Sequence, residues 1–152
     1  MRNISVFVKN LNASQNSFYM IKELNKCIND CSLSAGVIYQ EKSIPPVPTL
    51  FSCKMINGLS SFQGTLIATT IEDAKTMLKI NNKSSRFLYL WDMPWIESPV
   101  NFELASGVLR DEKLSIIARS ESHADCIENF CNRRPIGVVD NWDLESLLKI
   151  TK

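Results

Sequence analysis

Two short polar segments contain side chains that could bind an anion. Thr69 and Thr70 follow one apolar run of the chain, and Arg119, Ser120 and Glu121 follow another. Each segment lies just before a predicted helix, where free backbone N–H groups favour a phosphate, and an Arg adds charge and donors. These five residues are therefore predicted to bind ligand. The alternative is that Thr70 and Ser120 only cap helices, and that Arg119 pairs with a neighbouring acid.

A third segment combines a carboxylate with aromatic rings. Residues 91–95 read WDMPW and directly follow an apolar, strand-like run. Asp92 could act as a base or bind a ribose or sugar hydroxyl, and Trp91 and Trp95 could stack on a ring. Trp91 and Asp92 are therefore added to the predicted ligand-binding residues. The alternative is that both tryptophans are packing residues and that Asp92 caps a turn before Pro94.

No motif in the sequence identifies a reaction, so the catalytic residues are unknown. The candidates are Asp92 and Glu121. The only histidine, His123, lies near Ser120 and Asp125. These three residues fall within one short helical segment, which does not produce the chain of hydrogen bonds of a catalytic triad. A triad is therefore not expected, and a solvent-facing or first-turn position for His123 is favoured over a catalytic one.

No cofactor or metal is predicted. The first predicted turn, residues 8–13, contains no glycine, whereas the dinucleotide fingerprint needs a glycine-rich turn that lets the backbone approach the pyrophosphate. There is no Walker A sequence either, so nicotinamide, flavin and P-loop sites are disfavoured. Zinc sites combine close cysteine pairs at defined spacings, which this chain lacks. Four of its five cysteines are predicted to be small core residues: Cys27, Cys31, Cys126 and Cys131.

Apolar runs and helical patterns alternate along the chain, which predicts the elements that position these residues. Strands are expected at residues 4–8, 35–39, 49–53, 64–69, 87–91, 114–118 and 136–139. Helices are expected over residues 18–31 with Asn12 or Ser14 as N-cap, from Thr70 to about Ile80, and over 102–110, 121–132 and 142–150, with Asn141 capping the last. Helices supply the crossovers that parallel strands need, and short all-apolar strands suit a sheet buried on both faces.

The predicted fold is therefore α/β: a doubly wound, mostly parallel, Rossmann-like sheet of about six or seven strands with helices on both faces. The length of 152 residues fits a single domain over residues 1–152. Ligands bind such sheets beyond the carboxyl ends of the strands, near the point where strand order reverses. That rule selects the loops at residues 9–14, 53–64, 69–70, 91–95, 119–123 and 140–141.

Composition limits the kinds of binding partner and the cellular compartment that are expected for this chain. The formal net charge of +1 and the absence of a basic stripe argue against a nucleic-acid partner. The one adjacent basic pair, Arg133 and Arg134, is expected at a helix C-terminus, where it complements the helix dipole. No stretch is long and apolar enough for a membrane span, and no signal peptide is recognisable, so a cytoplasmic location with free thiols is expected.

Several segments together resemble one Rossmann-like half of a two-domain, GT-B-type glycosyltransferase. They are GTLIATT (64–70), FLYLWD (87–92), LSIIARSESH (114–123) and PIGVVDN (135–141). The resemblance implies a nucleotide-sugar or sugar ligand, with Arg119 and Glu121 contacting donor phosphate or sugar hydroxyls. The chain departs from that family in the spacing of its acidic pair, Glu121 and Glu128.

A glycosyltransferase of this type places its active site between two such domains, whereas this chain has room for one. The resemblance therefore implies a homodimer or a partner chain that supplies the second half, or a domain that binds without catalysis. The alternative function is a non-catalytic α/β interaction or regulatory protein without a small-molecule substrate, because fold does not imply function.

Overall fold

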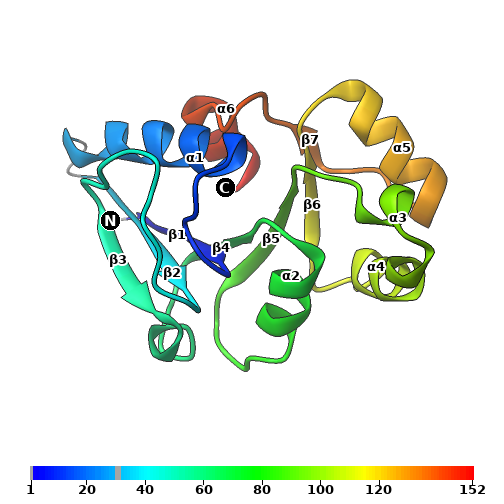
Figure 1. Cartoon of the computed structure of the whole chain (residues 1–152), viewed down its shortest axis with the longest axis horizontal. Helices are drawn as coiled ribbons and strands as arrows, with labels where there is room; N and C mark the ends of the chain where they lie inside the picture. The colour runs from blue at the N-terminus through cyan, green and yellow to red at the C-terminus, as the bar shows by residue number, and fades with distance from the viewer. Residues whose placement is uncertain (1, 30–31) are drawn as a thin grey trace.

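Seven parallel strands form one sheet through the centre of the molecule (Figure 1). The structure is a computed structural model, which describes residues 2–29 and 32–152. In chain order the strands are β1 (Arg2–Val8), β2 (Leu33–Tyr39), β3 (Ser52–Met55), β4 (Thr65–Ala68), β5 (Ser85–Leu90), β6 (Ser115–Ala118) and β7 (Gly137–Val138). Across the sheet their order is β3-β2-β1-β4-β5-β6-β7, and each described pair is parallel. The predicted doubly wound α/β sheet is confirmed.

Helices cover both faces of the sheet. They are α1 (Gln15–Asn25), η1 (Lys26–Asn29), η2 (Ile56–Gly58), α2 (Ile71–Leu78), α3 (Pro94–Glu97), η3 (Pro99–Asn101), α4 (Phe102–Leu109), α5 (Glu121–Cys131) and α6 (Leu144–Ile150). One apolar core joins α1 and α6 to the sheet, and a second joins α2, α4 and α5 to the opposite face. Figure 1 shows α1 and α6 above the strands and α2 and α4 below them. None of the helices in the described part of the chain is long and apolar enough to cross a membrane.

β1 lies at the point where the strand order reverses. Residues 4–8 are all buried, as expected of an apolar strand that is covered on both sides. Phe7 packs in the core on the α2 face, and its neighbour Val6 packs in the core on the α1 face. Val6 lies opposite Val37 of β2 and Ile67 of β4, so β1 is paired along both edges.

Three helix starts match their predicted caps. The hydroxyl oxygens of Ser14, Thr70 and Ser120 each accept a hydrogen bond from the backbone N–H three residues further on, at 3.0, 3.1 and 3.2 Å. Ser14, rather than Asn12, is therefore the N-cap of α1. All three caps lie at the carboxyl edge of the sheet, where each helix begins after its strand.

The predicted start of the last helix is wrong. Asn141 does not cap it, and Trp142 is not helical, because both residues take left-handed backbone angles (φ 43° and 64°). Asp143 is the N-cap instead, and its carboxylate accepts from the N–H of Ser146 at 2.9 Å. The left-handed turn brings Trp142 into the core, where its indole N–H donates to Oδ1 of Asn16 at 2.7 Å.

The edge strand β3 also differs from expectation. The prediction placed a strand at residues 49–53, whereas β3 comprises Ser52–Met55, and all four of its residues are exposed. The described connections on either side, residues 40–51 and 56–64, contain the single turn η2 and no α-helix. No helix is predicted between residues 39 and 64, and the connections to β3 agree with that prediction.

The basic pair after α5 is structural. Arg133 Nη1 donates to the backbone carbonyls of Leu109, at 3.2 Å, and Asp111, at 2.7 Å. Leu109 is the last residue of α4, so the Arg133 guanidinium satisfies carbonyls at the C-terminus of that helix. A basic side chain at a helix C-terminus is what the sequence predicted for this pair. The helix that Arg133 stabilises is α4, not the α5 helix that precedes it in the sequence.

Candidate functional site

A pocket of about 210 Å³ lies at the carboxyl ends of β1 and β4. β1 leads through α1 to β2 on one side, and β4 leads through α2 to β5 on the other, so the two connections diverge here. This is the reversal point at which doubly wound sheets bind ligands. Its wall is made by the loop after β1, the start of α1, and the start of α2: Val8, Lys9, Asn10, Asn12, Ala13, Ser14, Asn16, Ser17, Met20, Thr69, Thr70 and Asp73.

The loop after β1 is fixed by hydrogen bonds instead of glycine. The backbone N–H of Leu11 donates to Oγ of Ser43 at 2.7 Å, and the carbonyl of Lys9 accepts from the N–H of Glu41 at 2.8 Å. The Lys9 ammonium lies 3.8 Å from the Glu41 carboxylate, and both side chains are mostly exposed. The loop that follows β2 therefore buttresses the pocket wall, while the charge of Lys9 remains at the rim.

The start of α1 presents hydrogen-bond donors to this pocket. Ser14 caps the N–H of Ser17, whereas the N–H groups of Gln15 and Asn16 belong to the first turn and have no acceptor within the helix. Of these two residues, Asn16 lines the pocket. The side chain of Asn16 is held by the indole of Trp142. The wall at α1 is therefore rigid and carries the positive end of a helix dipole.

The opposite wall contains the two threonines predicted from the sequence. Thr69 is buried at the end of β4, and Thr70 caps α2. Both residues line the pocket, so the structure places them at the predicted carboxyl edge. Whether they bind a ligand remains a prediction.

Asp73 is the most unusual polar group in the pocket wall. Its side chain is 1% exposed, and its Oδ1 accepts a hydrogen bond from Nε2 of Gln40 at 2.8 Å. Its Oδ2 is buried and has no hydrogen-bond partner among the described residues. Burial raises the pKa of Asp73 to about 6. The Gln40 hydrogen bond opposes this shift, as do the Thr70 hydroxyl and the Lys9 backbone, which lie near the carboxylate but do not meet the geometry of a hydrogen bond to Oδ2. A buried, unsatisfied carboxylate oxygen of this kind calls for a functional explanation.

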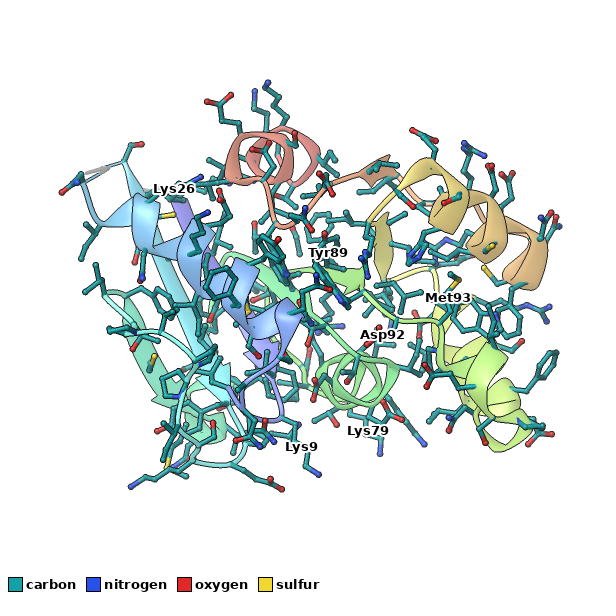
Figure 2. All side chains as sticks on the ribbon, turned by 45° about the horizontal axis from the view of Figure 1, so that its top comes forward. Lys9, Lys26, Lys79, Tyr89, Asp92 and Met93 are labelled. Atoms are coloured by element: carbon teal, nitrogen blue, oxygen red, sulfur yellow. The ribbon has the colours of Figure 1, made fainter. Side chains whose placement is uncertain are left out.

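The other predicted site residues lie further along the same edge, after β5 and β6. Figure 2 labels Lys9 at the end of β1, and Asp92 and Met93 after β5, as separate places on the molecule. None of Trp91, Asp92, Arg119, Ser120 or Glu121 lines the pocket at the reversal point. The seven predicted ligand-binding residues therefore divide into two groups.

Trp91 belongs to an aromatic cluster. The indole is 4% exposed, and its ring lies 6.1 Å from that of Tyr89 and 6.2 Å from that of Tyr19, between centroids. The guanidinium carbon of Arg119 lies 4.2 Å from the centroid of the Trp91 ring, a cation–π contact. Trp91 therefore packs in this cluster with Arg119 against its ring, and the ligand-binding roles predicted for both residues stay predictions. Trp95 stacks on Phe130 at 4.3 Å.

Glu121 is part of an exposed ion-pair cluster around Arg134. The Arg134 guanidinium lies 3.4 Å from Glu121, 3.2 Å from Asp125 and 2.6 Å from Glu128. Glu121 and Glu128, the acidic pair noted in the sequence, are therefore both ion-paired with Arg134. Asp125 is also committed to Arg134, and so the structure gives no triad with His123.

His123, in the first turn of α5, lies near the charged side chains of Arg119 and Asp92. Its Nδ1 is buried without a hydrogen-bond partner in the described part of the chain, although the residue as a whole is half-buried. Burial lowers the pKa of His123, the nearby Arg119 charge lowers it further, and Asp92 opposes the shift. The imidazole is therefore mostly neutral at physiological pH.

Sequence reasoning missed the two residues that give the pocket its chemistry. In the sequence, Asp73 is only an acid three residues after the predicted N-cap Thr70, and Gln40 has no distinguishing pattern. These side chains meet across 33 positions of sequence, through the pairing of β2, β1 and β4. The position of Asp73 three residues after a predicted N-cap indicates a helix start, but it does not predict that the carboxylate is buried.

A second hollow, of about 220 Å³, opens on the sheet surface over β1, β2 and β3. Small residues such as Ser5, Gly36 and Ser52 line it, together with Lys54. This hollow involves the starts of strands as well as their middles, away from the carboxyl edge, and has no buried charged group. The pocket beside Asp73 is therefore the better candidate.

Metal binding has no support in the described residues, which contain no cluster of three or more histidine, cysteine or acidic side chains able to hold an ion. Cys27 and Cys131 are buried, as predicted for core cysteines. The same prediction is wrong for Cys126, which is exposed, as is Cys53. Cys31 lies outside the described residues.

Comparison with known protein families, curated proteins and solved structures finds no match to this chain. Inference about function therefore rests on the pocket itself.

Proposed function

We propose that this chain is a glycosyltransferase-like domain that binds a nucleotide-sugar or related phosphorylated ligand at the carboxyl ends of β1 and β4. The observation that carries the proposal is the pocket at the reversal point, which joins two helix starts to a buried carboxylate with a free oxygen. A ligand of this class offers phosphate oxygens and hydroxyl groups together. The pocket offers complementary groups to both.

The phosphate would lie at the start of α1. The N–H groups of Gln15 and Asn16 are free of helical acceptors, and the helix dipole and Lys9 at the rim add positive potential. The Asp73 carboxylate repels an anion, which favours placing the phosphate away from α2. This arrangement needs no glycine-rich turn, because the donors come from the helix start.

The size of the pocket favours a second protein surface. Its volume of about 210 Å³ is below the roughly 300–1,000 Å³ of sites that bury a drug-sized ligand. A nucleotide-sugar would therefore project from this pocket, and a second copy or a partner chain would supply the other wall. The remaining candidates at the edge, Asp92 and Glu121, would serve catalysis only in such an assembly.

Thermal unfolding against a panel of nucleotide-sugars, free nucleotides and dinucleotides tests the proposal. A ligand at one hundred times its dissociation constant adds about 2.7 kcal/mol, which raises the midpoint by several degrees in a domain of this size. Ser14→Ala should reduce the shift, since it disturbs the start of α1. Asp143→Ala is the matched control, because it removes the N-cap of α6, outside the pocket and outside the predicted ligand-binding residues. No shift in the wild-type protein would reject the proposal.

The second candidate function is a non-catalytic interaction protein, and one observation favours it. Ile96 and Phe102, near the stacked pair Trp95 and Phe130, are 65% and 54% exposed. Exposed apolar patches mark interaction surfaces. Under this alternative, Ile96→Asp would abolish self-association measured by light scattering, and the ligand panel would give no thermal shift.

A further inference from the structure

Asp73 is held in place as a directional acceptor. Gln40, at the end of β2, fixes Oδ1 from one side, and the backbone N–H of Asp73 is anchored by the Thr70 hydroxyl. The remaining oxygen, Oδ2, belongs to a side chain that lines the pocket. Burial without a partner weakens folding, as the raised pKa of Asp73 also indicates. The position is therefore better explained by a ligand than by stability.

The surrounding charges restrict what could pair with Oδ2. A cationic group is disfavoured, because the positive ends of α1 and α2 both point to this pocket and Lys9 lies at its rim. An anion is repelled by the carboxylate itself. Glu41 is engaged by Lys9 on the outer side of the loop. The complementary group is thus a neutral hydrogen-bond donor.

We infer that Oδ2 of Asp73 accepts a hydrogen bond from a hydroxyl group of the bound molecule, and that Asp73 thereby selects polyol ligands, such as a ribose or sugar, at this pocket. The inference rests on the proposed function for the pocket and adds the ligand group that it recognises. A donor at Oδ2 would satisfy the buried oxygen, and a ligand without that hydroxyl would leave it desolvated and unpaired.

Asp73→Asn is the decisive variant. Asparagine keeps the size of the side chain and the Oδ1 acceptor for Gln40, but places an NH₂ donor where Oδ2 stands. Glu72→Gln is the matched control, because it removes the same charge from the neighbouring position of the same helix, with an exposed side chain outside the pocket. Circular dichroism verifies that both variants are folded.

The probes form two sets, measured by calorimetry and NMR chemical-shift perturbation. The first set lacks phosphate: ribose, glucose, uridine and adenosine. The second set is phosphorylated: UDP-glucose, ADP-glucose and GDP-mannose. Asp73→Asn should weaken the binding of every probe that occupies the pocket by roughly tenfold or more, as expected for a lost hydrogen bond to a charged group. Glu72→Gln should change it less than about twofold, the scale of a screened surface charge.

The outcomes separate this inference from the proposed function. Binding of phosphorylated probes that is equal in wild type and Asp73→Asn overturns the inference and leaves the proposed function standing. Binding of unphosphorylated probes alone, lost in Asp73→Asn, supports the inference and rejects the phosphorylated ligand. If no probe of either set binds the wild-type protein, both are rejected.

Discussion

A single buried carboxyl gives this protein a stability that depends on pH. The pKa of Asp73 is raised from 3.8 to about 6 in the folded state, chiefly by burial. Below about pH 4 the group is protonated whether the chain is folded or not, and it has no effect. As pH rises from about 4 to about 6 the unfolded chain loses its proton first, so folding stability falls and stays lower above that range. The difference of about two pKa units corresponds to about 3 kcal/mol.

Asp73→Asn should therefore stabilise the folded protein where the wild type is ionised. At about pH 8 the variant should unfold at a free energy higher by up to about 3 kcal/mol, and at about pH 4 the two proteins should converge. Urea unfolding at both pH values measures this. A variant less stable than wild type at about pH 8 would show that Asp73 contributes to folding, and a difference that does not change with pH would contradict the raised pKa of Asp73.

Tyr89 illustrates the opposite case, a buried polar group with its partners in place. Its hydroxyl donates to the carbonyl of Val139 at 2.6 Å and accepts from the N–H of Trp142 at 3.4 Å. Burial raises the pKa of Tyr89 to about 12, so it stays neutral and keeps its donor.

Tyr89→Phe should destabilise the protein by about 1–3 kcal/mol, because it leaves the Val139 carbonyl and the Trp142 N–H buried without this partner. Urea unfolding measures the loss. Tyr19→Phe is the control: Tyr19 is half-buried in the same aromatic cluster, and its hydroxyl has no hydrogen-bond partner among the described residues. Equal losses in the two variants would contradict the hydrogen-bond explanation.

At the scale of elements, glycine fixes the entry of the chain into β4. Gly64 has φ +138°, a left-handed value that other residues rarely adopt, and a Cβ there would collide with the backbone oxygen of Asn3 in β1. Gly107, in α4, has helical geometry and open space around it. The two glycines therefore have opposite roles, one required by the backbone and one replaceable.

Gly64→Ala should cost at least about 1–3 kcal/mol, because it adds a steric clash to a strained backbone. Gly107→Ala should instead stabilise the protein by about 0.4–1 kcal/mol, since alanine has the higher helix propensity. Thermal unfolding of both variants compares the two directly. A loss of stability in Gly107→Ala would contradict the open space described around α4.

At the scale of the whole molecule, the elements themselves could be predicted from the sequence more fully than the contacts between the loops at their ends. The alternation of apolar runs and capped helices predicted the doubly wound sheet, because those signals are local. The β3 crossover and the left-handed turn at Trp142 have no such signal. The pairing of Gln40 with Asp73 requires the strand order itself, which periodicity does not contain. Thr69 and Thr70 were found because the carboxyl-end rule needs only the positions of strands.

The strand order also predicts how the sheet opens in solution. β1 is paired on both sides and covered on both faces, whereas β3 is paired only with β2, and its four residues are all exposed. Hydrogen exchange reports local opening, which is easiest where few apolar contacts hold the backbone. Amides of β3 should therefore exchange orders of magnitude faster than those of β1, measured by NMR at low protein concentration. Protection of β3 that grows with concentration would instead indicate that a second copy covers this edge.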